Sequence, residues 1–142
     1  FERGTFVLAQ PAYAQNDAAE DLVASKRAAN MTYRELMNMF SHALGEIQDG
    51  MVRRNEELVK QGANVILTHP APKSKPWTIM AAPNQDGFKQ ALLAYDKVLD
   101  VHAKATVSAA VDQDWSTGVE ALGQLQAACN SCQQEWMNKA LR

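Results

Sequence analysis

Apolar side chains recur at intervals of three and four residues in four long stretches of the chain, which is the spacing of one face of an α-helix. These stretches predict helices over about 32–48, 52–68, 87–111 and 116–141, and a shorter helix over about 17–29. The clearest stripe belongs to the first long helix and comprises Tyr33, Leu36, Met37, Phe40, Ala43, Leu44, Ile47 and Met51. Every element that the periodicity predicts is therefore helical.

Short polar motifs mark the expected ends of these helices. Capping-box spacing, in which a side-chain acceptor is followed three residues later by Glu, occurs at Asp17–Glu20, Thr32–Glu35 and Thr117–Glu120. Asp86 is expected to cap the third long helix, and Gln48-Asp49-Gly50 to end the first.

Prolines interrupt the helical pattern between residues 69 and 86. Each proline removes a backbone donor and disfavours helix in the residue before it, so this segment is predicted to be one long loop. The prolines are Pro70, Pro72, Pro76 and Pro83. The apolar side chains available to anchor the loop are Trp77, Ile79 and Met80.

Four amphipathic helices with short connections and one long crossing predict an all-α protein, an antiparallel four-helix bundle with an N-terminal arm or short extra helix. The 142 residues suffice for one domain. We expect the bundle over 16–142 and a separate segment over 1–15. No stretch approaches the roughly 18–20 apolar residues that cross a bilayer, so no transmembrane span is expected.

The segment 1–15 has two interpretations. Ala12-Tyr13-Ala14 has the small-x-small form that ends an export signal, although Glu2 and Arg3 are polar where such a signal is apolar. Alternatively, the segment is a mature arm whose apolar side chains lie on a partner. The first interpretation predicts export, and the second predicts a docking contact.

The composition excludes several classes of function. Hydrophobic residues make up 46% and charged residues 21% of the chain, and the formal net charge is −2, which gives no basic surface for nucleic acid. The sequence has no phosphate loop, no nucleophile–histidine arrangement and no paired carboxylates on an apolar helix face. We therefore expect a protein that is not an enzyme.

Cys129 and Cys132 lie three residues apart on the last predicted helix, so both thiols are on one face. Four chemistries use this spacing: thioether bonds to haem, thiol–disulfide exchange, half of a zinc site, and a local disulfide. A redox pair normally opens a helix after a strand, and zinc needs two further ligands that the three scattered histidines do not supply. Haem attachment and a vestigial, haem-free pair are the interpretations that the context favours.

The chain resembles the cytochrome c′ family over about residues 30–137. The resemblance depends on the order and spacing of four loose motifs. They are Tyr33-Arg34 before an apolar run, Gly45 to Met51 at the end of that helix, Asp86-Gly87-Phe88-Lys89 before an alanine-rich helix, and Ala128-Cys129-Asn130-Ser131-Cys132 with Trp136 four residues further on.

The resemblance implies a periplasmic protein that carries covalent haem c and serves electron transfer or the binding of small gases. Cys129 and Cys132 are then the thioether attachment points, and Gln133 occupies the position of the family's axial histidine. Met37, Asn38 and Phe40 are expected on the distal face of the haem. Either Gln133 or Met37 is then the iron ligand, although methionine is also an ordinary core residue.

The expected partners are a redox protein or a larger complex, reached through the N-terminal arm and associated with a membrane only through that partner. A homodimer is the other assembly that the sequence allows. The alternative function is a haem-free bundle, with no cofactor, that acts as an accessory or structural subunit of such a complex. The missing histidine and the apolar arm motivate this alternative.

Overall fold

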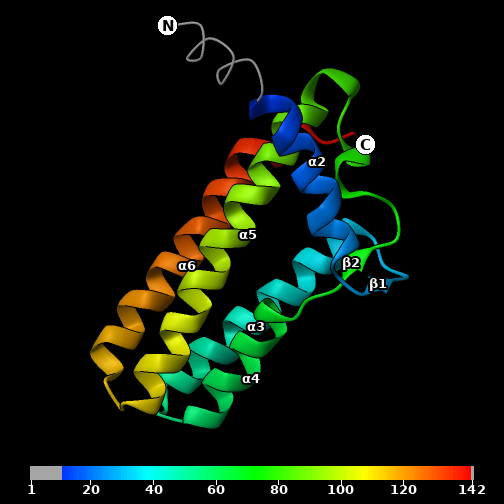
Figure 1. The fold of residues 1–142 in the computed structure, drawn as a ribbon. Helices are drawn as coiled ribbons and strands as arrows, with labels where there is room; N and C mark the ends of the chain where they lie inside the picture. Colours follow the sequence, from blue (N-terminus) through cyan, green and yellow to red (C-terminus); the bar gives the residue numbers. More distant parts are fainter. Residues whose placement is uncertain (1–10, 142) are drawn as a thin grey trace, which may run out of the picture.

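The computed structural model describes residues 11–141, with side chains from residue 18 onward, and this part of the chain is all-α apart from one two-residue parallel ladder and one isolated β-bridge, between Met80 and Ala140 (Figure 1). The elements in order are α2 (Pro11–Ala24), β1 (Ala28–Ala29), α3 (Tyr33–Val52), α4 (Glu56–Leu67), β2 (Ala71–Pro72), the 3-10 helix η1 (Pro76–Ile79), α5 (Ala82–Val111), α6 (Trp115–Trp136) and the 3-10 helix η2 (Met137–Lys139). No helix within residues 11–141 is long and apolar enough to cross a membrane.

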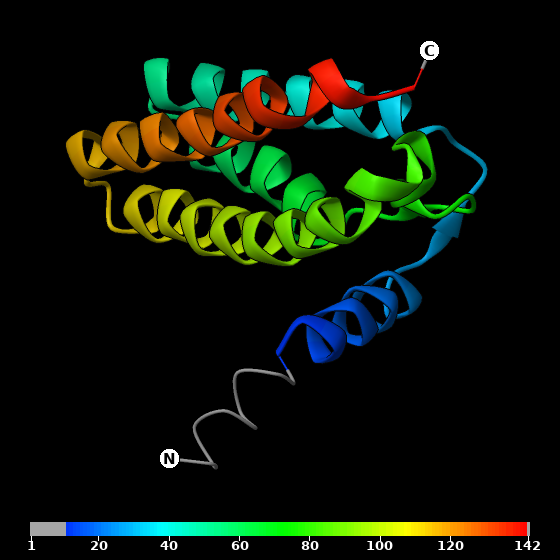
Figure 2. The same ribbon diagram turned by 90° about the horizontal axis from the view of Figure 1, so that it is seen from above.

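The four long helices pack on one another pairwise. α3 packs against α4 and α6, and α5 packs against the same two helices. The core between them includes Ile47, Val59, Phe88 and Leu125, each fully buried. α2 packs against α5 at an oblique angle (Figure 2), and the β1–β2 ladder joins the segment after α2 to the segment after α4.

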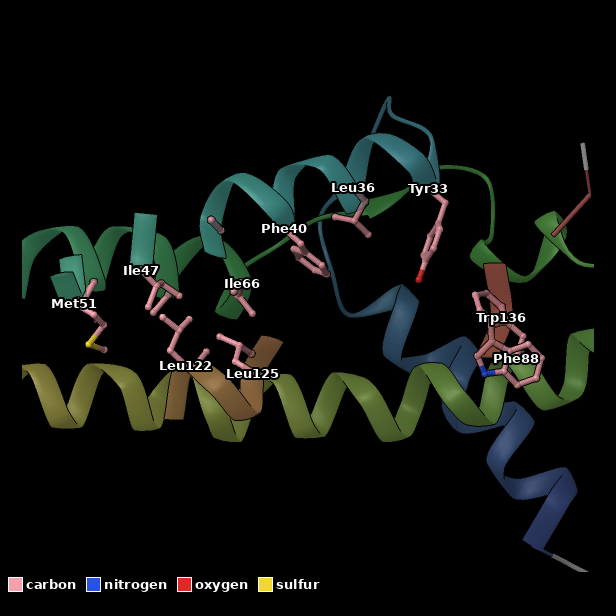
Figure 3. Close-up of a cluster of buried hydrophobic side chains, with 14 of the residues drawn as sticks. Tyr33, Leu36, Phe40, Ile47, Met51, Ile66, Phe88, Leu122, Leu125 and Trp136 are labelled. Carbon is pink, nitrogen blue, oxygen red and sulfur yellow. The ribbon is translucent and has the colours of Figure 1, made fainter. Parts of the chain in front are cut away.

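The predicted start of α3 is confirmed. The hydroxyl of Thr32 accepts a hydrogen bond from the Glu35 backbone N–H at 3.1 Å, and the Glu35 carboxylate accepts one from the Thr32 N–H at 2.8 Å. This reciprocal cap satisfies two of the donors that a helix start leaves unpaired. Below the cap, Tyr33, Leu36 and Phe40 project to the same side of α3 (Figure 3).

The predicted end of α3 and start of α4 are wrong by a few residues. Gly50 does not stop the helix, because it is buried inside α3, where a Cβ would come within 2.7 Å of the Val59 side chain. The chain turns only after Val52, through Arg54 at φ 51°. Asn55 then caps α4 by accepting a hydrogen bond from the Leu58 N–H at 3.2 Å.

The predicted loop over 69–86 is shorter and more ordered than expected. α5 begins at Ala82, not at Asp86, because Pro83 falls in the first turn, where its missing N–H costs no hydrogen bond. The preceding segment forms β2 and η1. Trp77 and Met80 are buried, as predicted for its anchors.

Two further predicted helix starts are wrong. Asp114, not Thr117, caps α6, and its carboxylate accepts hydrogen bonds from both the N–H and the hydroxyl of Thr117. α2 begins at Pro11, six residues before the expected cap at Asp17, and ends at Ala24. The expected arm over 1–15 therefore overlaps the first turn of α2, and its first ten residues lie outside the described residues.

The end of the last helix and one of its expected inward residues also differ. α6 gives way to η2 after Trp136, although a helix to 141 was predicted. The apolar periodicity of the last helix predicts Val119 on its inward face, but Val119 is 56% exposed, because Gly118 takes the position against α3.

Gly62 on α4 is predicted to tolerate no side chain. A Cβ there would lie 2.6 Å from the Ala43 carbonyl oxygen of α3, and backbone cannot move without separating the two helices. Gly62→Ala should lower the free energy of unfolding by about 1–3 kcal/mol. Gly45→Ala on α3, where nothing lies within 4 Å, should raise it by about 0.5–1 kcal/mol. Urea unfolding of both variants measures the two changes in the free energy of unfolding, which should have opposite signs. Equal changes would contradict the close approach of α3 and α4 at Gly62.

Candidate functional site

A cavity of about 470 Å³ with a predominantly apolar lining lies beside the core. Its lining side chains come from α2, α3, α5 and α6 and from the connection between α4 and η1. The size is within the usual range of sites for small molecules and cofactors. Contact of so much apolar surface with water is unfavourable, and such surfaces usually mark a binding site. The cavity is therefore the strongest candidate for a binding site in the described part of the chain.

Cys129 and Cys132 both line this cavity from α6. They are half-buried free thiols, one helical turn apart, as the spacing predicts. Burial raises the pKa of the Cys129 thiol above its usual value. Burial, followed by the neighbouring Cys129 and by Glu135, raises the pKa of Cys132 to about 11. Both sulfurs are therefore neutral S–H groups at neutral pH.

The neutral thiols argue against thiol–disulfide exchange, and the surroundings of the cysteines argue against zinc. Thiol–disulfide exchange requires a thiolate, and redox-active pairs have lowered pKa values, the opposite of what burial produces here. Among the side chains of residues 18–141, no three from His, Cys, Asp or Glu are grouped in a way that could hold a metal ion, so a zinc site built around the two cysteines lacks its remaining ligands there.

The structure brings most of the predicted site residues to the same cavity. Gln133 lines it from α6, and Met37 and Phe40 line it from α3. Asn38 is exposed and is not part of the lining, because the helical period directs residues 36, 37 and 40 toward the cavity and residue 38 away from it.

Tyr33 also lines the cavity, and it contributes a polar hydroxyl group. The sequence pattern predicted Tyr33 only as a member of the apolar stripe on the first long helix. The side chain is 9% exposed, and its ring packs edge-on against Phe88 at a centroid distance of 5.9 Å. Burial raises the pKa of the phenol well above its usual range, and the negative charge that Cys132 and Cys129 carry when ionised raises it further. The hydroxyl is therefore a neutral group in the cavity wall that also contains both cysteines.

A cluster of three polar residues, Lys26, His69 and Asp96, lies in the same wall and was not predicted from the sequence. The Nζ of Lys26 lies 3.2 Å from Asp96 Oδ1, and the Nε2 of His69 lies 3.3 Å from the same oxygen. The three residues come from the segment after α2, from α5 and from the segment after α4. Because no short motif connects them, only the fold reveals the cluster.

This cluster is expected to make folding stability depend on pH. The hydrogen bond from His69, assisted by Lys26, lowers the pKa of the Asp96 carboxyl below 3.8, the ordinary value for Asp. A carboxyl with a lowered folded-state pKa contributes stability above its ordinary pKa and loses it as the pH falls through the lowered value. Asp96→Asn should therefore reduce stability at neutral pH and remove part of the acid dependence below pH 3.8.

Asp100→Asn on the same helix is the matched control for this prediction. Asp100 pairs with Lys104 at 2.9 Å, but both side chains are largely exposed, so the change should stay within about 0.5 kcal/mol. Thermal melts of the three proteins across the acid range provide the measurement. The same acid dependence in Asp96→Asn and in the unmodified protein would show that the cluster contributes nothing.

The described part of the chain is thus an all-α protein with an apolar cavity, and two thiols line one wall of that cavity. Comparison of the chain with protein-family models, with curated proteins and with solved structures finds no match.

Proposed function

We propose that this chain is a cytochrome c′-like haem protein of the periplasm, in which Cys129 and Cys132 hold the haem by thioether bonds for electron transfer or for binding of small gases. In this proposal α3, α4, α5 and α6 form an antiparallel four-helix bundle. The closed ring of contacts, in which α3 and α5 each pack against both α4 and α6, supports this arrangement.

The observation that carries the proposal is the position of the two thiols on one wall of the 470 Å³ apolar cavity. A haem supplies two vinyl groups, an iron and a large apolar ring. The cavity offers two neutral S–H groups one turn apart, and Leu36, Phe40 and Leu92 as apolar lining. Addition of a thiol S–H across a vinyl double bond forms one C–S and one C–H bond, and it consumes no oxidant.

The cavity also favours this function over a purely structural subunit. A helical subunit that serves only as a scaffold has no need of an apolar hollow that opens to solvent. Residues on four helices and on the segment after α4 instead converge on a space next to the cysteines. Such convergence of apolar walls with a few polar groups is typical of a ligand site.

A pyridine haemochrome spectrum of protein purified from its native host tests the proposal. The expected result is the spectrum of a haem with two saturated thioether links that stays with the chain through denaturation. A spectrum without a Soret band would overturn the proposal and leave the haem-free accessory subunit as the surviving interpretation. Purification from the native host matters, because the attachment motif ends in Gln133 instead of histidine.

A further inference from the structure

The Tyr33 hydroxyl is a polar group of the cavity wall that has no partner in the described part of the chain. Its side chain lines the cavity and is 9% exposed. Another tyrosine of the same wall, Tyr95, has its hydroxyl 3.0 Å from Ser131 Oγ, whereas the Tyr33 hydroxyl makes no hydrogen bond to any group of residues 18–141. Buried polar groups are almost always hydrogen-bonded, so the unpaired hydroxyl needs an explanation.

The open side of the Tyr33 hydroxyl is the cavity. Among residues 18–141, Trp136 Nε1 is the only fully enclosed side-chain nitrogen or oxygen that lacks a partner. The Tyr33 oxygen also lacks a partner but is not enclosed, so it is open to the space that its side chain lines. Figure 3 shows this oxygen at the end of the ring that points away from the α3 ribbon.

The position of this hydroxyl is well defined. Tyr33 is the first residue of α3, directly after the Thr32 cap. Its ring packs edge-on against Phe88 at a centroid distance of 5.9 Å, and Phe88 packs in the same manner against Trp136 at 5.4 Å. A donor that is already held in place loses little conformational entropy when a ligand binds to it.

The other polar groups of the wall offer no unpaired charge to a ligand. Lys26 Nζ and His69 Nε2 lie 3.2 and 3.3 Å from the same oxygen of Asp96, so the carboxylate and the ammonium already neutralise each other. A charged ligand would therefore enter an apolar space without a counter-ion, which is strongly unfavourable. The exposed polar residues of the wall, whose atoms can bond to water, are Ser41, Gln126 and Asn130.

The group that complements Tyr33 is an uncharged hydrogen-bond acceptor. Burial raises the pKa of the phenol well above its usual range, so the hydroxyl keeps its hydrogen. A phenol donates hydrogen bonds more strongly than it accepts them, because the ring withdraws electron density from the oxygen. A carbonyl oxygen would satisfy this donor, while the apolar lining accommodates a hydrocarbon body.

We propose that the cavity, in a chain without haem, binds an uncharged apolar carbonyl compound, a ketone or an ester, whose oxygen accepts a hydrogen bond from Tyr33. This inference goes beyond the proposed function, because it assigns a second class of ligand to the cavity and does not depend on attached haem. The side chains of Leu36, Leu92 and Leu99 provide apolar lining for the body of this ligand.

Equilibrium dialysis of the full-length chain with both Cys129 and Cys132 replaced by serine tests the inference, because no covalent haem occupies its cavity. The two compounds used are methyl β-naphthyl ketone and β-ethylnaphthalene, which has a similar shape but no oxygen. Both should bind. Tyr33→Phe in this background should weaken binding of the ketone about five- to tenfold and leave binding of the hydrocarbon unchanged.

Tyr95→Phe in the same background is the matched control. Its hydroxyl is also in the cavity wall but is already paired with Ser131, so this variant should change neither affinity. Infrared spectra of the bound ketone give a second measurement. A hydrogen bond lowers the carbonyl stretching frequency, so the frequency should rise in Tyr33→Phe and stay unchanged in Tyr95→Phe.

The outcomes separate this inference from the proposed function. Failure of the ketone to bind, or equal binding of the ketone with and without the Tyr33 hydroxyl, would overturn the inference. Tighter binding of β-naphthoate, which is charged, than of the ketone would also overturn it. A native protein that carries no covalent haem would overturn the proposed function alone.

Discussion

Replacement of both Cys129 and Cys132 by serine is expected to abolish covalent haem attachment while the helical fold persists. The two thiols are the only cysteines of the chain, and both line the apolar cavity. A serine hydroxyl does not form the thioether, so the double variant should retain no haem after denaturation. Each single variant should keep one link and a reduced yield of bound haem. A haem stain of denaturing gels, loaded with equal amounts of protein, measures the effect.

Gln134→Ala is the matched control for the cysteine variants. Gln134 lies on the same helix, is exposed and is not part of the cavity lining. It should bind as much haem as the unmodified protein, and circular dichroism should show similar helix content in all variants. Haem that stays covalently attached in the double cysteine variant would contradict the assignment of the attachment points.

Phe88→Ala is expected to cause the largest loss of stability of any single substitution considered. Phe88 is fully buried and packs edge-on against both Tyr33 and Trp136, with ring centroids 5.9 and 5.4 Å away (Figure 3). Truncation removes these aromatic contacts and leaves a void at the junction of α3, α5 and α6. The free energy of unfolding should fall by about 3–5 kcal/mol.

Val101→Ala on α5 is the control for this loss. Val101 is 56% exposed, so its truncation should change the stability by no more than about 0.5 kcal/mol. Urea unfolding followed by circular dichroism compares the two variants. A loss below about 1 kcal/mol in Phe88→Ala would show that the aromatic cluster is not a well-packed part of the core.

The sequence predicted the helices well where local chemistry decides them. The α3 stripe from Tyr33 to Met51 matches the buried face of that helix, because a period of 3.6 residues in the sequence directly produces a continuous face. The boundaries that differ depend on tertiary contact. Gly50 looks like a stop signal in the sequence, yet in the fold it lets α4 approach α3 closely. Pro83 is a loop signal in the sequence, yet it lies in the first turn of α5.

The sequence predicted those residues of the cavity wall that lie together on one helix, because their spacing alone places them on one face. The spacing of Cys129 and Cys132 already places both thiols on one face, and the α3 stripe contains Met37 and Phe40. The cluster of Lys26, His69 and Asp96 brings together three segments far apart in the chain, and none of these residues has a local signature. Residues of this kind become visible only when the fold places them side by side.

The mass of the intact, denatured protein from its native host is the most direct test of covalent haem attachment. The proposed function predicts a mass equal to the chain plus one haem, with no free thiol left to react with an alkylating reagent. The double serine variant should have the mass of the bare chain. An unmodified protein with the mass of the bare chain, whether Cys129 and Cys132 are two free thiols or one disulfide, would contradict the account.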